Sequence, residues 1–218
     1  MSGLFITFEG GEGAGKSTQA GLLAGFLRAA GHEVELTREP GGTPGAEALR
    51  DFLLFGGHDL CARAEVLAHF AARADHVERR ILPALQQGRI VICDRFTDST
   101  EAYQGYGLSH ADPAMLDMIA RLRALIPVVP DLTFVLQVPA AIAHARMAQR
   151  GSDRTDRYEA LDTAFHARVA QGFDVVASRD GTRCRRIDAS GAVDGVQAAL
   201  RAELEPFLAG MAGRAGNG

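Results

Sequence analysis

Short apolar runs alternate along the chain with longer stretches in which apolar residues recur at helical spacing. Five of the short runs are rich in β-branched and aromatic residues, which is typical of strands. They cover residues 4–9, 33–37, 89–94, 131–138 and 183–188. The third run is almost continuously apolar until it ends in Asp94, a pattern that indicates a strand buried on both faces of a parallel sheet.

The segments between these runs have the periodicity of helices. They lie at residues 18–27, at about 46–87 with a break at Gly56-Gly57, and after Asp112-Pro113, where a capping aspartate precedes a first-turn proline. Strands separated by helices imply right-handed crossovers and a parallel sheet covered on both faces. The pattern therefore predicts one α/β domain over residues 1–208, followed at 209–218 by a tail that we expect to be disordered.

Composition narrows the class of protein. Of the 218 residues 47% are apolar and 23% charged, and the net charge of −4 gives no basic field for nucleic acid or a membrane surface. No run approaches the roughly 18 to 20 apolar residues of a membrane span, and the first residues lack the basic region of a signal peptide. The cysteines Cys61, Cys93 and Cys184 have no C-x-x-C spacing, which favours reduced thiols in a cytoplasmic protein.

The segment Gly10-Gly11-Glu12-Gly13-Ala14-Gly15-Lys16-Ser17 fits the pattern G-x-x-x-x-G-K-[ST]. In that pattern the loop N–H groups surround nucleotide phosphates, the lysine reaches the β- and γ-phosphates, and the hydroxyl holds Mg²⁺. Lys16 is the only lysine of the chain, and every other basic residue is arginine, whose planar guanidinium does not copy the fit of a compact ammonium. A strand precedes the loop and a helix follows it, so we predict a phosphate-binding loop and not an ordinary glycine-rich turn.

Three further groups of residues are expected at the carboxyl ends of the strands, where parallel sheets bind their ligands. Asp94-Arg95-Phe96 offers a carboxylate for Mg²⁺ beside an arginine for a second anion. The loop from Thr37 to Gly42 places Arg38 near the same edge, and residues 146–157 carry arginines in a polar segment suited to a lid over ATP. Taken singly, the first group also fits a surface ion pair, the second a simple turn and the third a solvated charged loop.

Together these segments resemble thymidylate kinases from Phe5 to about Leu200. The matching stretches are FEGGEGAGKST (8–18), TREPGGT (37–43), Ala72-Arg73 with Pro83-Ala84-Leu85, DRFTDSTEAYQG (94–105) and a DR-x-E lid sequence that ends at Glu159. The resemblance implies a P-loop NTPase-type three-layer α/β/α fold with a five-stranded parallel sheet and a small lid at about 146–158. It also implies a homodimer that transfers a phosphoryl group from ATP to dTMP with Mg²⁺, giving dTDP.

The resemblance further implies a role for each matching residue. ATP would be bound by Gly10, Gly11, Glu12, Gly13, Ala14, Gly15, Lys16, Ser17, Thr18 and Ala189, and Mg²⁺ by Ser17 and Asp94. The residues expected around dTMP are Glu9, Arg38, His69, Phe70, Arg73, Arg95, Ser99, Thr100, Tyr103 and Gln104. The residues expected to act in catalysis are Lys16, Glu12, Arg95, Arg150 and Arg154.

Different residues of this set would contact the phosphate, the sugar and the base of dTMP. Arg38 and Arg95 would clamp its phosphate, and Arg73 would contact the edge of the thymine. Tyr103 would pack against the deoxyribose where a ribose 2′-hydroxyl would clash. Either Gln104 or Thr100 would reach the base.

Two roles are not settled by the resemblance: the residue that stacks on the base and the cation beside the transferred phosphoryl group. Family members carry phenylalanine four residues before the thymine-contacting arginine, where this chain has His69 followed by Phe70. Neighbouring helical residues point about 100° apart, so both cannot face the base equally, and we favour His69. The loop Glu12-Gly13-Ala14 has no arginine, so the cation beside the transferred phosphoryl group would come from the lid, from Arg150, Arg154 or Arg157.

Two other classes of protein share such a loop. A kinase of another nucleoside monophosphate has the same sheet and lid, although TREPGGT and Ala102-Tyr103-Gln104 favour dTMP. A switch that reads guanine needs N-K-x-D, which a chain with one lysine lacks. The attacking group in a monophosphate kinase is a phosphate oxygen that is already anionic. We therefore expect catalysis by positioning and charge neutralisation, without a general base.

Overall fold

The computed structural model describes residues 3–150 and 156–215. All five predicted strands are found within one residue at each end, as β1 (Leu4–Glu9), β2 (Val34–Arg38), β3 (Ile90–Asp94), β4 (Leu132–Gln137) and β5 (Cys184–Asp188). They form one parallel sheet in the order β2-β3-β1-β4-β5. The predicted α/β fold with a five-stranded parallel sheet is therefore confirmed.

The helices alternate with these strands. Their bounds are α1 (Lys16–Ala29), α2 (Pro44–Phe55), α3 (Ala62–His76), α4 (Leu82–Gln86), α5 (Thr97–Thr100), α6 (Pro113–Ala124), α7 (Ala140–Arg150), α8 (Thr163–Arg179) and α9 (Val193–Ala215). Two π-helical segments, η1 (Val77–Ile81) and η2 (Glu101–Leu108), continue α3 and α5. Asp112 caps α6 as the sequence predicts, since its side chain accepts a hydrogen bond from the Ala114 N–H.

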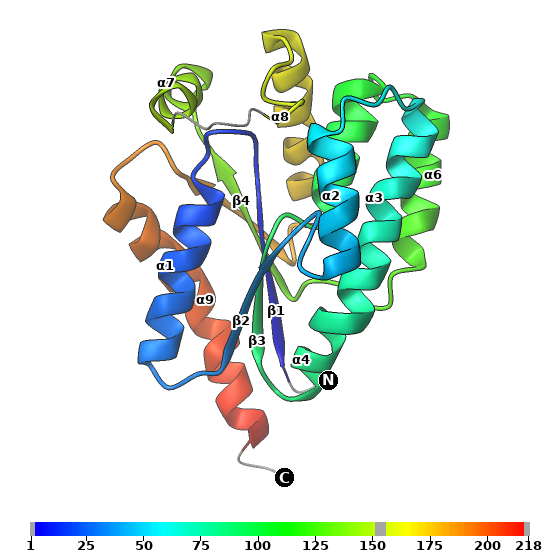
Figure 1. The fold of residues 1–218 in the computed structure, drawn as a ribbon. Helices are drawn as coiled ribbons and strands as arrows, with labels where there is room; N and C mark the ends of the chain where they lie inside the picture. The colour runs from blue at the N-terminus through cyan, green and yellow to red at the C-terminus, as the bar shows by residue number, and fades with distance from the viewer. Residues whose placement is uncertain (1–2, 151–155, 216–218) are drawn as a thin grey trace.

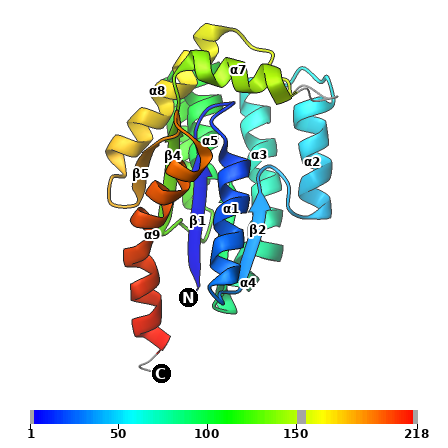
Figure 2. The ribbon, with the colours of Figure 1, turned by 90° about the vertical axis from the view of Figure 1, so that its left-hand side faces the viewer.

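Side chains of β1 point alternately to the two faces of the sheet, so the core has two layers. Leu4, Ile6 and Phe8 point to one face, where they pack against α1 and α9, while Phe5 points to the opposite face. That second face is covered by α3, α4, α6, η2 and α8 (Figures 1 and 2). Helices on both sides of the sheet give the predicted three layers.

The C-terminal helix corrects one expectation. α9 extends to Ala215 with Pro206 inside it, so in this structure the helix continues into the segment that was expected to be a disordered tail. None of the helices within residues 3–150 and 156–215 combines the length and the apolar content that a bilayer crossing requires.

A buried ion pair joins the sheet to the helices on its second face. Asp98, which is 1% exposed, accepts hydrogen bonds from Arg183 at 2.7 and 2.9 Å. Arg123 adds a third cationic contact to Asp98 at 3.1 Å, and Arg183 also donates to the Thr133 hydroxyl at 2.7 Å. Loss of the carboxylate would leave these cations without their main counter-charge in a poorly hydrated site.

We predict that Asp98→Ala lowers the free energy of unfolding by about 3–5 kcal/mol, the cost of breaking a buried pair. Urea unfolding followed by circular dichroism measures this. Asp117→Ala is the matched control, because its pair with Arg121 is exposed at both ends and should contribute less than about 1 kcal/mol. Equal losses in the two variants would contradict a special role for the buried pair.

Candidate active site

Two cavities flank the loop between β1 and α1, at the carboxyl ends of the strands. The larger encloses about 520 Å³ and the smaller about 310 Å³, and both are lined by Gly13, Gly15 and Thr18. Side chains from α2, α3, η2 and residues 156–159 complete the larger cavity, while α7 and the loop after β5 border the smaller one. One glycine-rich loop thus separates two places where a ligand can bind.

Backbone geometry shows why the loop is rich in glycine. Gly13 has a φ of 72°, in the left-handed region, and a Cβ there would collide with the Ala143 carbonyl of α7. The Lys16 ammonium donates to the Gly11 carbonyl at 2.8 Å, so it lies folded over the loop. Burial lowers the pKa of Lys16 to about 8, and the nearby Arg95 cation adds to this shift.

Arg95 occupies the wall between β3 and the loop. Its φ of 70° is a left-handed conformation that non-glycine residues rarely adopt, which is characteristic of functional positions. Its guanidinium donates to the Gly10 carbonyl at 2.9 Å and to the Tyr103 hydroxyl at 2.9 Å, and it forms an ion pair with Glu12. Although burial acts against the charge, Glu12 and other acidic groups hold the pKa of Arg95 above its usual range.

Glu9 lies beneath this wall and not on it. One carboxylate oxygen accepts from the Phe96 N–H at 2.8 Å and the other from the Ser99 hydroxyl at 2.5 Å. Burial, with a contribution from Asp98, raises the pKa of Glu9 to about 7. The structure therefore corrects the expectation of a direct substrate contact, because this fully buried carboxylate holds the loop that carries Arg95.

A pair of oxygen ligands lies at the opposite corner of the larger cavity. The Ser17 hydroxyl donates to Oδ2 of Asp94. Within the part of the chain that the structure describes, the buried Oδ1 of Asp94 has no hydrogen-bond partner. Carboxylate and hydroxyl oxygens are hard ligands of the kind that Mg²⁺ prefers, so these two residues fit the predicted metal position.

Two arginines approach the larger cavity from the loop after β2 and from α2. Arg38 is paired with Glu47 at 3.2 Å and its side chain remains 57% exposed, so it is free to turn toward an anion. Arg50 donates to the Pro40 carbonyl at 2.9 Å. Burial, together with the charge of Arg38, lowers the pKa of Arg50.

The far end of the larger cavity is built around Arg73. Its Nε donates to Glu39 at 2.7 Å, and Nη2 donates to the Phe96 carbonyl and the Thr100 hydroxyl, both at 3.0 Å. Nη1 is buried and has no hydrogen-bond partner among the described residues. A guanidinium fixed on three sides therefore keeps one donor for a ligand.

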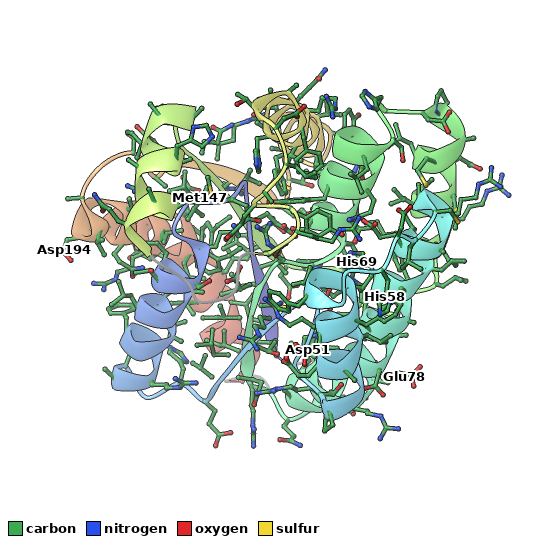
Figure 3. The ribbon with its side chains drawn as sticks, turned by 45° about the horizontal axis from the view of Figure 1, so that its top comes forward. Asp51, His58, His69, Glu78, Met147 and Asp194 are labelled. Atoms are coloured by element: carbon green, nitrogen blue, oxygen red, sulfur yellow. The ribbon has the colours of Figure 1, made fainter. Side chains whose placement is uncertain are left out.

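The two candidates for base stacking point in different directions, as the helical geometry requires. His69 lines the larger cavity, whereas Phe70 belongs to the core cluster and lies 4.8 Å below the Arg73 guanidinium. In Figure 3 His69 lies near the middle of the molecule, whereas Glu78 lies at its edge. Burial and the nearby Arg73 lower the pKa of His69 to about 3, so the imidazole is neutral. Phe70 is thus corrected from a possible base contact to a core residue.

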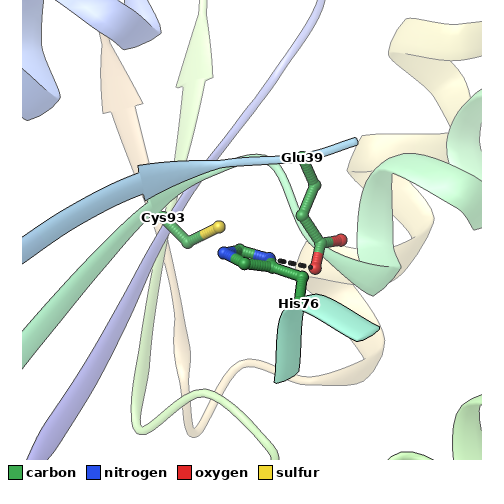
Figure 4. Close-up of side chains that lie close together, drawn as sticks. All are labelled: Glu39, His76 and Cys93. Carbon is green, nitrogen blue, oxygen red and sulfur yellow. Dashed lines mark hydrogen bonds and ion pairs between the residues drawn. The ribbon is translucent and has the colours of Figure 1, made fainter. Parts of the chain in front are cut away.

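Glu39, His76 and Cys93 form a buried group behind Arg73 (Figure 4). His76 Nδ1 donates to Glu39 at 3.0 Å, and its Nε2 accepts from the Thr37 hydroxyl at 2.7 Å. Burial raises the pKa of the Cys93 thiol, whose hydrogen bond goes to the Arg95 carbonyl. With both imidazole nitrogens engaged and the thiol protonated, the group works as a hydrogen-bond relay that holds Glu39 against Arg73, and not as a metal site.

The smaller cavity has a different character. Ala14, Ala189 and Gly191 line it together with Arg146 and Gln149 of α7. The Arg146 guanidinium lies 3.5 Å from both the Gly13 and the Gly191 carbonyls, so it bridges the two loops that border the cavity. Figure 3 shows α7, marked by Met147, beside the loop that precedes α1.

Most residues predicted from the sequence converge here. Those that line the larger cavity are Glu12, Gly13, Gly15, Lys16, Ser17, Thr18, Arg38, His69, Arg73, Asp94, Arg95, Ser99, Thr100, Tyr103 and Gln104. Ala14 and Ala189 line the smaller cavity. Gly10 and Gly11 instead offer their carbonyls to Arg95 and Lys16. Arg154 and the side chain of Arg150 lie outside the described residues.

Several cavity residues were not predicted from the sequence as site residues. Arg50, Arg146 and Tyr158 each line a cavity, and Glu39 holds Arg73. Arg50 lies within the ordinary periodicity of α2, so its spacing carries no signal. Tyr158 and Arg146 stand inside the lid sequence, which pointed to the region but not to these side chains.

The fold and the site together define a class of protein. A parallel sheet with a phosphate-binding loop after β1, two flanking cavities and converging arginines is the arrangement of a P-loop phosphotransferase. The sequence model of the family described as Thymidylate kinase matches residues 8–200. The chain belongs to the thymidylate kinase family.

Individual relatives agree with this assignment. The chain is 59% identical over 198 residues to the thymidylate kinase of Gluconobacter oxydans, which covers 91% of this chain and 92% of the relative. It is 49% identical to that of Rhizorhabdus wittichii, over 95% of this chain and all of the relative. The crystal structure of thymidylate kinase from Ehrlichia chaffeensis superposes with a TM-score of 0.75 at 36% identity, covering 93% of this chain and 98% of that one.

The lowered pKa of Lys16 predicts a pH dependence. A lysine is cationic below its pKa, so the free protein holds the charge at pH 7 and loses it as pH rises through about 8. We expect kcat/KM for the nucleotide triphosphate to fall about tenfold per pH unit above that value. The control is kcat/KM for the phosphoryl acceptor, measured at a saturating concentration of the triphosphate. It should stay nearly flat over this range, because bound phosphates raise the pKa of Lys16. If kcat/KM for the triphosphate stayed constant up to pH 9.5, Lys16 would not be the cation that binds its phosphates.

Proposed function

We propose that the protein transfers the γ-phosphoryl group of ATP to dTMP, giving ADP and dTDP. The observation that carries the proposal is the pair of cavities that meet at one phosphate loop, with cations on both sides of the meeting point. The smaller cavity would hold the adenosine of ATP, and the larger one dTMP. Their phosphates would then meet beside Lys16 and Arg95.

Positioning and charge neutralisation would supply the catalysis. The attacking oxygen of dTMP is already anionic at neutral pH, so the barrier lies in bringing two polyanions together. Lys16 would hold the β- and γ-phosphates, and Arg95 with Arg38 would hold the phosphate of dTMP. Arg50 stands on the same side, and lid arginines would complete the set of cations around the transferred group.

The metal expected in this reaction fits the residues present. Ser17 and the unpartnered Oδ1 of Asp94 would hold Mg²⁺. When bound, Mg²⁺ neutralises phosphate charge and orients the phosphate oxygens.

The sugar and base would be read by rigid side chains. Tyr103 is buried against the rings of Tyr158, Phe165 and Phe173, and its hydroxyl donates to Glu12 at 2.7 Å. Because Tyr103 is packed so tightly, it would not move to make room for a ribose 2′-hydroxyl. Arg73 Nη1 would donate to a carbonyl of thymine, with the neutral His69 stacked on the ring.

We also propose that the enzyme is a homodimer and works in the cytoplasm. Leu67 of α3 and Leu125, just after α6, remain 50% and 75% exposed on elements that touch each other, which gives an apolar surface for a second copy. Free thiols at Cys61, Cys93 and Cys184 agree with a reducing compartment. The sedimentation coefficient at micromolar concentration measures the oligomeric state.

A substrate panel tests the reaction itself. With ATP and Mg²⁺, we expect dTMP to be phosphorylated with a kcat/KM at least about 10³-fold above CMP, GMP or AMP, because the base pocket must satisfy buried polar groups. Lys16→Ala should lower turnover by about 10²- to 10³-fold while the circular dichroism spectrum stays unchanged. Preference for another monophosphate would identify a different nucleotide kinase. Binding of ATP without any monophosphate acceptor would identify a switch protein.

A further inference from the structure

A buried carboxylate on α3 lies behind the end of the cavity where the base would bind. Glu65 of α3 is 1% exposed. One of its oxygens accepts from the Tyr158 hydroxyl at 2.7 Å and from the Gln104 amide nitrogen at 3.0 Å. The other oxygen is paired with Arg157 at 3.1 Å. Glu65 itself stands one layer outside the cavity, and the reaction described above gives it no role.

The carboxylate dictates which way the Gln104 amide points. An ionised carboxylate only accepts hydrogen bonds, so the amide nitrogen must face Glu65. The same nitrogen donates to the Tyr158 hydroxyl at 2.9 Å. With both amide hydrogens engaged, the group that Gln104 can offer to a ligand in the cavity is its carbonyl oxygen, which is an acceptor.

Tyr158 completes the arrangement. Its hydroxyl donates its one proton to Glu65, and it therefore accepts from Gln104 and from His69 Nε2, which lies 3.1 Å away. Burial and the adjacent Glu65 raise the pKa of Tyr158, so the hydroxyl keeps that proton. Its ring is stacked on Phe165 and stands edge-on to Tyr103, which fixes the hydroxyl in space.

We propose that Glu65 is a positioning residue that sets base specificity by holding the Gln104 carbonyl oxygen toward the base. This inference deepens the proposed function and rests on it. The pocket then presents an acceptor from Gln104 and a donor from Arg73 Nη1. In thymine the ring N3–H would donate to the Gln104 acceptor, and the O4 carbonyl would accept from Arg73. Cytosine carries the opposite group at both places, a ring nitrogen that accepts and an amino group that donates.

The test compares dTMP with dCMP as phosphoryl acceptors. A site built to pair with a substrate N–H discriminates by about 10⁴- to 10⁵-fold against an analogue that lacks it. In Glu65→Gln the buried charge is gone and the two facing amides can pair in either orientation, so Gln104 can turn its nitrogen to the base. We expect the ratio of kcat/KM for dTMP over dCMP to fall at least about tenfold, with KM for ATP changed less than about twofold.

Glu101→Gln is the matched control. Glu101 is also a buried glutamate, 8% exposed, and it is paired with Arg179 at 2.7 Å on the other side of η2. Its loss should lower stability and leave the dTMP to dCMP ratio within about twofold of the parent enzyme. A ratio that changes equally in both variants would show a general effect of losing a buried charge, and would overturn the proposal.

Two further outcomes are decisive. If Glu65→Gln folds and loses activity toward both substrates in the same proportion, the role of Glu65 is structural and the proposal fails. If Glu65→Gln does not fold, Tyr158→Phe carries the test, because it removes the acceptor of one Gln104 amide hydrogen. That variant should lower the ratio at least about threefold, and an unchanged ratio would overturn the proposal. A parent enzyme that phosphorylates neither substrate would instead refute the proposed function.

Discussion

Like charges gathered in a buried cavity repel one another, and the site depends on how that repulsion is balanced. The larger cavity collects the cationic side chains of Lys16, Arg38, Arg50, Arg73 and Arg95. The three arginines that the proposal places against dTMP are each paired with a carboxylate, Arg95 with Glu12, Arg38 with Glu47 and Arg73 with Glu39. These carboxylates hold the cations in place, and in the proposed reaction phosphate groups would replace them as counter-ions. Burial instead lowers the pKa of Lys16, which forms no ion pair with a carboxylate among the described residues.

The supporting residues explain how this charge can be concentrated without loss of the fold. Glu9 fixes the backbone that holds Arg95 in its left-handed conformation, and Glu39 is itself held by His76. Glu65 plays the same part at the base end of the cavity. In each case a buried, hydrogen-bonded carboxylate orients a residue that the proposal places against a ligand. The sheet supplies the rigid frame, because β1 and β3 end side by side at this edge.

Much of this arrangement could be predicted from the sequence, because its signals are local. The apolar run that ends in Asp94, the cap at Asp112 and the loop around Lys16 each depend on short-range rules, and all lie where predicted. Glu9 and Phe70 were assigned wrongly because a motif gives a residue's neighbourhood but not the direction of its side chain. Glu65 was missed because its partners Arg157 and Tyr158 are distant in sequence, and only the packing of α3 against residues 156–159 brings them together. Arg50 was missed because it falls within the ordinary periodicity of α2.

In the proposed reaction two nucleotides meet end to end across one phosphate loop. Titration calorimetry with adenosine and deoxythymidine joined through a chain of phosphates tests it directly. One molecule should bind per chain, more tightly than either nucleotide alone, because linked ligands occupy both cavities at once. Both ATP and dTMP should displace it. Competition with only one of the two nucleotides would contradict this end-to-end arrangement.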